Sequence, residues 1–413
     1  MERKDIYLAS KPRYEILDGL RGVAAVLVVA YHLFETYYGG SADQPINHGY
    51  LAVDFFFVLS GFVIGYAYDD RWGKMTTWGF FKRRLIRLHP MVIFGTLFGA
   101  VMFYFGSCSA FPLINDTPWY MVVLVMLWCF TMIPLPSGMD IRGWGETNPL
   151  NGPAWSLQWE YLANILYALV IRRFSKLLLG ICVAIFAVFT IILCLNIDIF
   201  GVLAERSYAS YTVIGGWSTT PDQLQIGFTR LLYPFFCGLL ISRLFIDHSP
   251  LTIDHSNAQP MFNVQWSMFN VKGGFWWCSL MIVILLGMPW LGLGTEGDSR
   301  WTNGLYEAFC ILVCFPIIVA IGAGSSVKGG KSEAINKFLG DISYPIYITH
   351  YPLIYMQMSW AESHKDAPLG MHIFVAVSIF FLAIGLAYAA LKLYDLPIRE
   401  WLRKKLFTST SSK

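Results

Sequence analysis

One stretch near the start of the chain decides its fold: Asp18-Gly19-Leu20-Arg21-Gly22-Val23-Ala24-Ala25-Val26-Leu27-Val28-Val29-Ala30-Tyr31-His32. Asp18 and Arg21 are spaced i, i+3, and the apolar run after them is long enough to enter a bilayer. Helical geometry places Arg21 and His32 about three turns apart on nearly the same face. Because an ionisable side chain is costly inside a membrane, this face is predicted to point into a protein interior.

The composition is that of an integral membrane protein. Of 413 residues, 56% are hydrophobic and 14% are charged, and the mean hydropathy is +0.51. A soluble domain carries about a quarter charged residues. The net charge of +3 is small, and no nucleic-acid partner is expected. Seven of the eight cysteines lie in or beside apolar runs, so neither a disulfide framework nor a metal site is expected.

Eleven apolar segments can be marked, at about residues 16–38, 50–69, 90–107, 117–134, 157–172, 175–196, 226–246, 274–293, 303–323, 338–360 and 370–394. Basic residues are enriched in cytoplasmic loops, and here they gather in both tails and between the second and third segments. Two cytoplasmic termini require an even number of crossings. One segment between Pro90 and Arg172 is therefore predicted not to cross. The candidates are the third segment, the fourth, or a fold-back over the Gly- and Pro-rich stretch from Ile133 to Pro153.

The predicted fold is all-α, a polytopic transmembrane helix bundle of about ten spans plus one re-entrant or interfacial element. It forms a single domain over residues 1–413, with a core from about 14 to 400 and short cytoplasmic tails. The first fifteen residues are polar and charged, unlike a cleavable signal sequence, so the first helix is expected to remain in the protein.

His32 is the first candidate for chemistry within this bundle. A lone histidine on an apolar face is often a hydrogen-bonded core residue. Its imidazole can also take a proton near neutral pH, as general-base activation of a hydroxyl requires. A helix that starts in the cytoplasm places His32 about 21 Å beyond Asp18, toward the outer half of the membrane. Asp18 and Arg21 fit a structural salt bridge at the cytoplasmic start of this helix.

A second candidate is the basic cluster in the segment Phe80-Phe81-Lys82-Arg83-Arg84-Leu85-Ile86-Arg87-Leu88-His89-Pro90. The pattern predicts an amphipathic helix that ends just before the proline. Its arginines fit an ordinary membrane anchor among lipid headgroups. Arg84 and Arg87 also share a helix face, and guanidinium groups bind phosphate oxygens in a bidentate manner, so a phosphate clamp is the other interpretation.

Five motifs, in order, resemble the membrane acyltransferase-3 family of integral O-acyltransferases over residues from about 14 to 400. They are Leu17-Asp18-Gly19-Leu20-Arg21-Gly22 with His32, Gly49 to Phe62, Arg84-Leu85-Ile86-Arg87, Trp155-Ser156-Leu157-Gln158-Trp159-Glu160, and Leu339 to His350. One departure lies near the carboxy end, where the family often has Glu followed two residues later by Pro. This chain has Asp395-Leu396-Pro397 there, which keeps the charge but shortens its reach.

The resemblance implies transfer of an acyl group, usually acetyl, from a cytoplasmic acyl-CoA to a hydroxyl of a carbohydrate or glycolipid acceptor. Acyl-CoA is then a donor substrate, and no bound cofactor is implied. His32 matches the essential histidine of the family, Arg84 and Arg87 match its arginine pair for the CoA phosphates, with Arg83 beside them, and Glu160 would orient His32 or a donor hydroxyl. The supporting residues around the cavity would be Asp18, Arg21, Asp54, Ser60, Trp155, Ser156, Ser343, Tyr344 and His350. Polar packing between helices is the alternative role for the last three.

The expected protein is thus a multi-pass O-acetyltransferase of a bacterial inner membrane that acts on surface or exported polysaccharide. Either His32 deprotonates the acceptor hydroxyl for direct transfer, or His32 is itself acylated and passes the group on. A secondary transporter of a small polar solute is the alternative function, since it would also have about ten helices with a few intramembrane charges. A membrane sensor or scaffold without catalysis is a further alternative.

Overall fold

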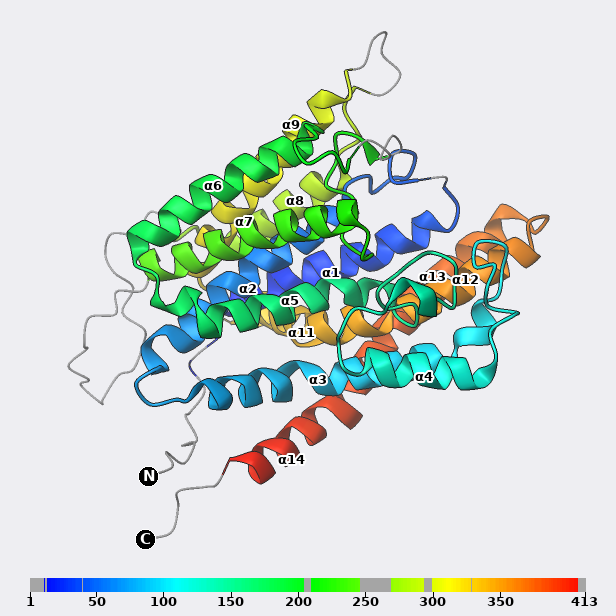
Figure 1. Ribbon diagram of the computed structural model, residues 1–413, viewed down its shortest axis with the longest axis horizontal. Helices are drawn as coiled ribbons and strands as arrows, with labels where there is room; N and C mark the ends of the chain where they lie inside the picture. Colours follow the sequence, from blue (N-terminus) through cyan, green and yellow to red (C-terminus); the bar gives the residue numbers. More distant parts are fainter. Residues whose placement is uncertain are drawn as a thin grey trace.

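The computed structural model describes residues 11, 13–38, 40–203, 209–245, 269–292, 299–327 and 329–407. These residues form helices joined by turns and loops, with no β-strand among them. The predicted all-α fold is therefore confirmed. Figure 1 shows the long helices lying side by side in one bundle, with α14 extending from it beneath α3.

Seven helical segments in the described residues are long and apolar enough to cross a membrane. They contain α1 (Glu15–Glu35), α2 (Ala52–Tyr68), α3 (Thr77–Val101), α6 (Lys176–Cys194), α7 (Pro221–Phe245), α9 (Trp301–Phe309) with α10 (Phe315–Gly324), and α13 (Leu369–Ala390) with α14 (Leu396–Leu406). The remaining helices are α4 (Trp119–Cys129), α5 (Trp155–Leu169), α8 (Gly274–Gly287), α11 (Gly330–Thr349) and α12 (Tyr351–Ser363). Seven is fewer than the predicted ten, because α4, α5, α8 and α12 have fewer than 18 residues and α11 carries several charges.

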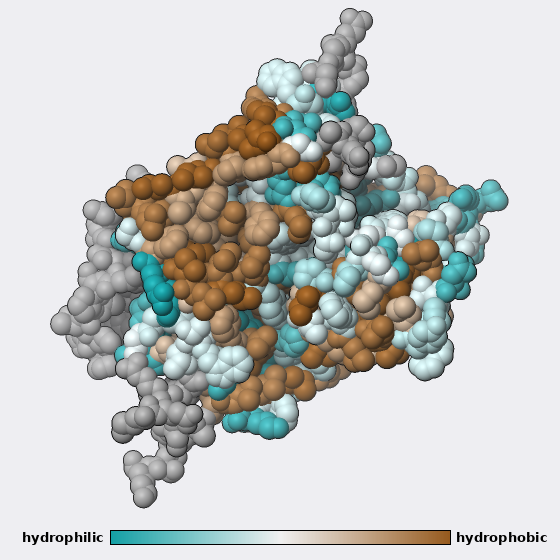
Figure 2. Space-filling model, in the orientation of Figure 1, coloured by the Kyte–Doolittle hydropathy of each residue, from teal (hydrophilic) through white to brown (hydrophobic). Residues whose placement is uncertain are grey.

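Apolar side chains cover the outside of the bundle. Along α6 the exposed residues include Leu177, Ile181, Ile185 and Val188, and Figure 2 shows a broad apolar surface over α6 and α7. More polar residues gather toward the right-hand end of the same view. Because monomeric soluble proteins rarely expose so large an apolar surface, this belt is the face that lipid covers.

Glycines bring pairs of helices into backbone contact. A Cβ atom on Gly22 of α1 would lie 2.2 Å from the Leu339 carbonyl oxygen of α11. A Cβ atom on Gly61 of α2 would lie 2.0 Å from the Phe235 carbonyl oxygen of α7. Helices in membranes associate through small residues of this kind. The α1–α11 and α2–α7 pairs are accordingly the most extensive helix contacts in the bundle.

Two predicted helix boundaries were wrong. The helix expected to end before Pro90 continues through it, and α3 runs from a cap on the Thr76 side chain, 2.9 Å from the Gly79 amide, to Val101. Proline is tolerated inside membrane helices because neighbouring groups can satisfy the backbone that it frees. Conversely, the single segment expected at 338–360 is two helices, α11 and α12, which meet at His350. Pro352 in the first turn of α12 has no N–H to continue the helical ladder.

The stretch from Ile133 to Pro153, one of the three candidates for the element that does not cross, does not form an α-helix. Leu135, Ile141 and Leu150 of this stretch are buried against α3, α4 and α12. Arg142 is fully buried, with its guanidinium 3.6 Å from the centre of the Tyr355 ring. The part from Glu146 to Pro153 is covered by protein, as irregular backbone must be within a membrane, whereas Ile133, Pro134 and residues 136–138 are exposed.

Candidate active site

A cavity of about 430 Å³ runs along α2 from the end of the bundle where basic residues gather. Its walls come from the described amino-terminal residues, α1, α2, α3, α5, α11 and α14, and they extend along α2 from Tyr68 to Val53. Because fifteen residues of helix rise about 22 Å, the cavity is about 22 Å long along α2. Its mouth is rich in cations, and the cationic lining residues are Lys11, Arg13, Arg21, Arg71, Arg83, Arg84, Arg87 and Arg403.

Among the described residues, two carboxylates line this cavity, and each is paired. Asp18 Oδ1 lies 3.2 Å from Arg21 Nη1, so the predicted salt bridge is confirmed. Glu160 Oε1 lies 2.7 Å from Arg84 Nη2 and accepts a hydrogen bond from Ser60 Oγ at 3.2 Å. Lys11 and Arg13 also pair with Asp70 and Asp341, at 2.8 and 3.4 Å. Since eight cations face these four carboxylates, the mouth keeps an excess of positive charge and suits a polyanion.

The arginines of α3 are placed differently from one another. Arg83 Nη1 donates to the Gly79 carbonyl oxygen at 2.8 Å, and its guanidinium lies 4.5 Å from the centre of the Phe407 ring. Arg84 points inward to Glu160, and Arg87 lies within electrostatic range of Asp18. The structure thus brings all three predicted arginines to one cavity, with Arg83 at its mouth.

The inner end of the cavity is closed by aromatic and hydroxyl side chains. Tyr347 of α11 has its hydroxyl 2.7 Å from Ser156 Oγ and 3.2 Å from the Pro153 carbonyl oxygen. Ser343 and Tyr344 also line the cavity, and their hydroxyls donate to the Gly340 and Leu88 carbonyl oxygens at 2.8 and 2.6 Å, respectively. These hydroxyls therefore serve helix packing as well as cavity lining.

His32 lies just beyond this inner end. Its Nδ1 is 2.7 Å from Glu35 Oε2, and its ring stacks on that of His350 with centroids 5.4 Å apart. His350 is buried, and its Nδ1 donates to the Tyr347 carbonyl oxygen at 3.1 Å. Tyr351 packs edge-on against His32 at 4.7 Å. Contacts from Tyr347 through His350 therefore connect the cavity to His32, which does not itself line the cavity.

Of the two roles expected for Glu160, orienting His32 does not match this geometry, and orienting a donor hydroxyl stays a prediction. Glu160 bonds to Arg84 and Ser60, whereas the carboxylate in contact with His32 is that of Glu35. Glu35 stands one turn after His32 on α1, so the i, i+3 spacing was a signal in the sequence. It was missed because a glutamate at the end of an apolar run also suits the membrane surface.

Asp54 and Trp155 lie apart from the cavity, in a buried polar cluster. Asp54 Oδ2 is 2.7 Å from Arg230 Nη2, and both side chains are almost fully buried. Arg230 also donates to the Tyr50 carbonyl oxygen at 2.7 Å and lies 5.3 Å from the centre of the Trp155 ring. These two predicted site residues are thus placed to support α2, α5 and α7 rather than to touch a ligand in the cavity.

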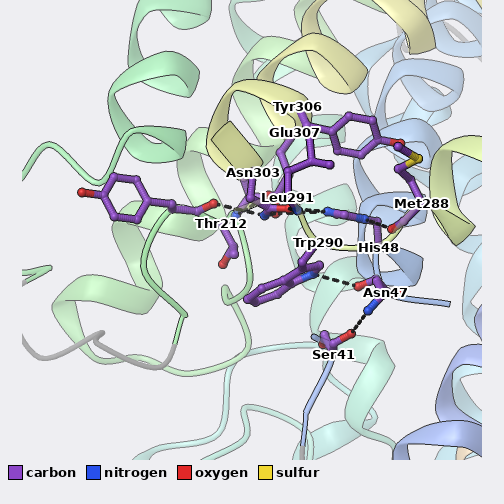
Figure 3. A network of polar contacts seen from close by, with 12 residues as sticks. Ser41, Asn47, His48, Thr212, Met288, Trp290, Leu291, Asn303, Tyr306 and Glu307 are labelled. Carbon is purple, nitrogen blue, oxygen red and sulfur yellow. Dashed lines mark hydrogen bonds and ion pairs between the residues drawn. The ribbon is translucent and has the colours of Figure 1, made fainter. Parts of the chain in front are cut away.

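The same cluster continues into the network drawn in Figure 3. Glu307 accepts hydrogen bonds from the Tyr50 hydroxyl at 2.6 Å, from Asn303 Nδ2 at 2.9 Å and from the Val213 amide at 2.7 Å. His48 has an oxygen within 3.0 Å of each ring nitrogen, and burial lowers its pKa to about 4. Because its polar groups already have partners, this network fixes loops to helices rather than offering a binding site.

Comparison with known proteins identifies the family to which this chain belongs. A family model described as an acyltransferase domain matches residues 14–392. Protein 2 in the picA locus of Rhizobium radiobacter is 32% identical over 163 residues, which are 38% of this chain and 81% of that protein. Acyltransferase MdmB of Streptomyces mycarofaciens is 28% identical over 40% of this chain and 41% of its own length.

A third relative, O-acetyltransferase OatA of Staphylococcus aureus, is 39% identical over 101 residues, which are 23% of this chain and 15% of that protein. No solved structure matches the chain. With a family match over nearly all of its length, the chain belongs to the membrane acyltransferase-3 family and is an O-acyltransferase.

Proposed function

We propose that this enzyme transfers an acetyl group from cytoplasmic acetyl-CoA to a hydroxyl of a carbohydrate acceptor on the opposite side of a bacterial inner membrane. The observation that carries the proposal is the shape and charge of one cavity. It is about 22 Å long along α2, cationic at its mouth and closed by Tyr347, which connects through His350 to His32. An acyl-CoA has the matching form, a polyanionic nucleotide joined to a long, thin arm that ends in the thioester.

The cationic mouth would hold the phosphates of the donor. Arg83 and Arg403 lie at the mouth, and Arg84 and Arg87 extend the positive charge inward. Guanidinium groups suit phosphate oxygens because their paired N–H groups match the geometry of the anion. Basic residues are enriched on the cytoplasmic side of membrane proteins. The mouth would therefore face the cytoplasm, and both termini would lie on that side too.

His32 would act as the base that activates the acceptor. With Nδ1–H donated to Glu35, the ring keeps a free lone pair on Nε2. Nε2 takes the proton of the acceptor hydroxyl while its oxygen attacks the thioester carbonyl carbon. The C–S bond then breaks, and the CoA thiolate leaves and recovers the proton from His32. Acylation of His32 itself is the alternative route, in which the acyl group moves from sulfur to Nε2 and then to the hydroxyl.

The name of one relative, O-acetyltransferase OatA, supports acetyl as the transferred group. The test uses the purified protein in liposomes with radiolabelled acetyl-CoA and envelope glycans extracted from cells that lack the gene. We expect label to enter the glycans and to be released by mild alkali, as an O-ester is. His32→Ala, shown by its elution volume to be folded, should transfer none. Folded wild-type protein that binds acetyl-CoA but labels no glycan would refute the proposed reaction.

Rapid mixing with acetyl-CoA in the absence of glycan separates the two routes. A labelled protein that is lost in His32→Ala supports the acyl-histidine route. Failure to trap any labelled protein argues for direct transfer.

A further inference from the structure

The inner end of the cavity is formed by two aromatic rings from different helices. Phe56 of α2 and Tyr347 of α11 both line the cavity, and their rings meet edge to face with centroids 5.5 Å apart. The Tyr347 hydroxyl is held by Ser156 and by the Pro153 carbonyl oxygen. Tyr347 is therefore fixed in place, whereas Phe56 is half-buried and held by apolar contacts alone.

His32 lies on the far side of this pair. The backbone of Tyr347 accepts the hydrogen bond of His350, and the His350 ring stacks on His32. Phe56 packs toward α1, in the same apolar cluster as Val29. An acyl group that comes from the cationic mouth therefore meets Phe56 and Tyr347 at the inner end of the cavity, before it can reach His32.

The mouth of the cavity imposes no comparable limit on the size of the ligand. It is open and lined by long, polar side chains, which can move aside for a ligand. At the inner end only Phe56 can turn, because Tyr347 is held by hydrogen bonds, and a well-packed interior resists each additional methylene group. The size of the acyl group therefore matters most at the inner end, where Phe56 and Tyr347 meet.

We propose that Phe56 and Tyr347 form an acyl-length filter, which admits an acetyl group and excludes longer acyl chains. This inference rests on the proposed function, since it concerns the donor of that reaction. It assigns chain-length specificity to an aromatic pair on α2 and α11 rather than to the arginines that bind CoA.

The test is a gain of function, which a misfolded variant cannot mimic. Wild type and Phe56→Ala are compared with acetyl-, butyryl- and hexanoyl-CoA as donors and the extracted glycans as acceptor. Each methylene group in a fitted pocket changes specificity roughly 10- to 200-fold. We expect Phe56→Ala to raise the hexanoyl-to-acetyl ratio of kcat/KM at least about tenfold over wild type.

Phe407→Ala is the matched control, because it removes an aromatic ring at the mouth of the same cavity. It should change the KM of all three donors by a common factor and leave their ratio unchanged. If Phe56→Ala does not fold, Phe56→Leu gives the same comparison with a smaller expected change. A ratio unchanged from wild type in the folded variant, or wild type using hexanoyl-CoA as well as acetyl-CoA, would overturn the filter alone. No transfer by wild type from any donor would overturn the proposed function with it.

Discussion

Glu35 offers the sharpest test of the proposed chemistry. Its carboxylate lies 2.7 Å from Nδ1 of His32, so it fixes the tautomer in which Nε2 is the base. Glu35→Gln keeps the size of the side chain. The amide can donate to Nδ1, which places the ring proton on Nε2 and removes the base. We expect kcat to fall while the KM for acetyl-CoA stays the same, because Glu35 does not line the donor cavity.

The size of the effect follows from the exposure of the pair. A hydrogen bond to a charged group contributes about 1.5 to 3 kcal/mol. The His32 and Glu35 side chains are 16% and 31% exposed, so solvent screening favours the lower part of this range. A loss of about 1.5 to 2 kcal/mol corresponds to a roughly 10- to 30-fold lower kcat.

The assay is O-acetyl transfer at saturating acetyl-CoA, measured for wild type, Glu35→Gln and Glu400→Gln. Glu400 is the control because its exposed side chain pairs with Lys404 on α14, away from His32. A kcat of Glu35→Gln within twofold of wild type would refute the role of Glu35. A rise in the KM for acetyl-CoA with no change in kcat would place Glu35 in donor binding instead.

Three further predictions concern other parts of the molecule. Asp54→Ala leaves Arg230 buried without its carboxylate, and we expect about 3 to 5 kcal/mol less stability, seen as a lower Tm in detergent; an unchanged Tm would contradict this. Burial raises the pKa of Glu146 to about 7, so the folded state holds that proton more tightly than the unfolded state. Stability should therefore fall as the pH rises from about 4.5 through about 7, and Glu146→Gln should flatten this part of the curve of Tm against pH. Arg84→Ala should raise the KM for acetyl-CoA roughly tenfold in a salt-sensitive manner, whereas Lys82→Ala should not; equal KM values in the two variants would count against the phosphate clamp.

The sequence was sufficient for the helical bundle and for the gathering of its basic residues. Long apolar runs have one solution in a bilayer, and the motif from Asp18 to His32 carries its own helical spacing. The sequence was less informative where the local preferences of proline and of helix ends compete with the packing of the bundle. Pro90 lies inside α3 because the bundle supports the helix around it. The apolar run near His350 contains a helix break, and Pro352 was its signal in the sequence.

The candidate site was predicted only in part, because motifs indicate which residues gather but not how they pair across helices. Arg84, Glu160, Ser156 and Tyr344 face one cavity, as a shared set of motifs suggested. Pairings across helices do not follow from spacing, so the bond between Glu160 and Arg84 was not foreseen. Tyr347, at the inner end of that cavity, lies within the motif from Leu339 to His350, but nothing else in the sequence distinguished it.

The glycine contacts have a consequence for motion. Backbone contact at Gly22 joins α1 to α11, and backbone contact at Gly61 joins α2 to α7, so each pair is expected to move as one rigid body. Phe56 belongs to the second pair and Tyr347 to the first. The width between their rings is therefore set by how one pair of helices slides against the other. A small shear between two stiff units would be enough to bring donor and histidine together.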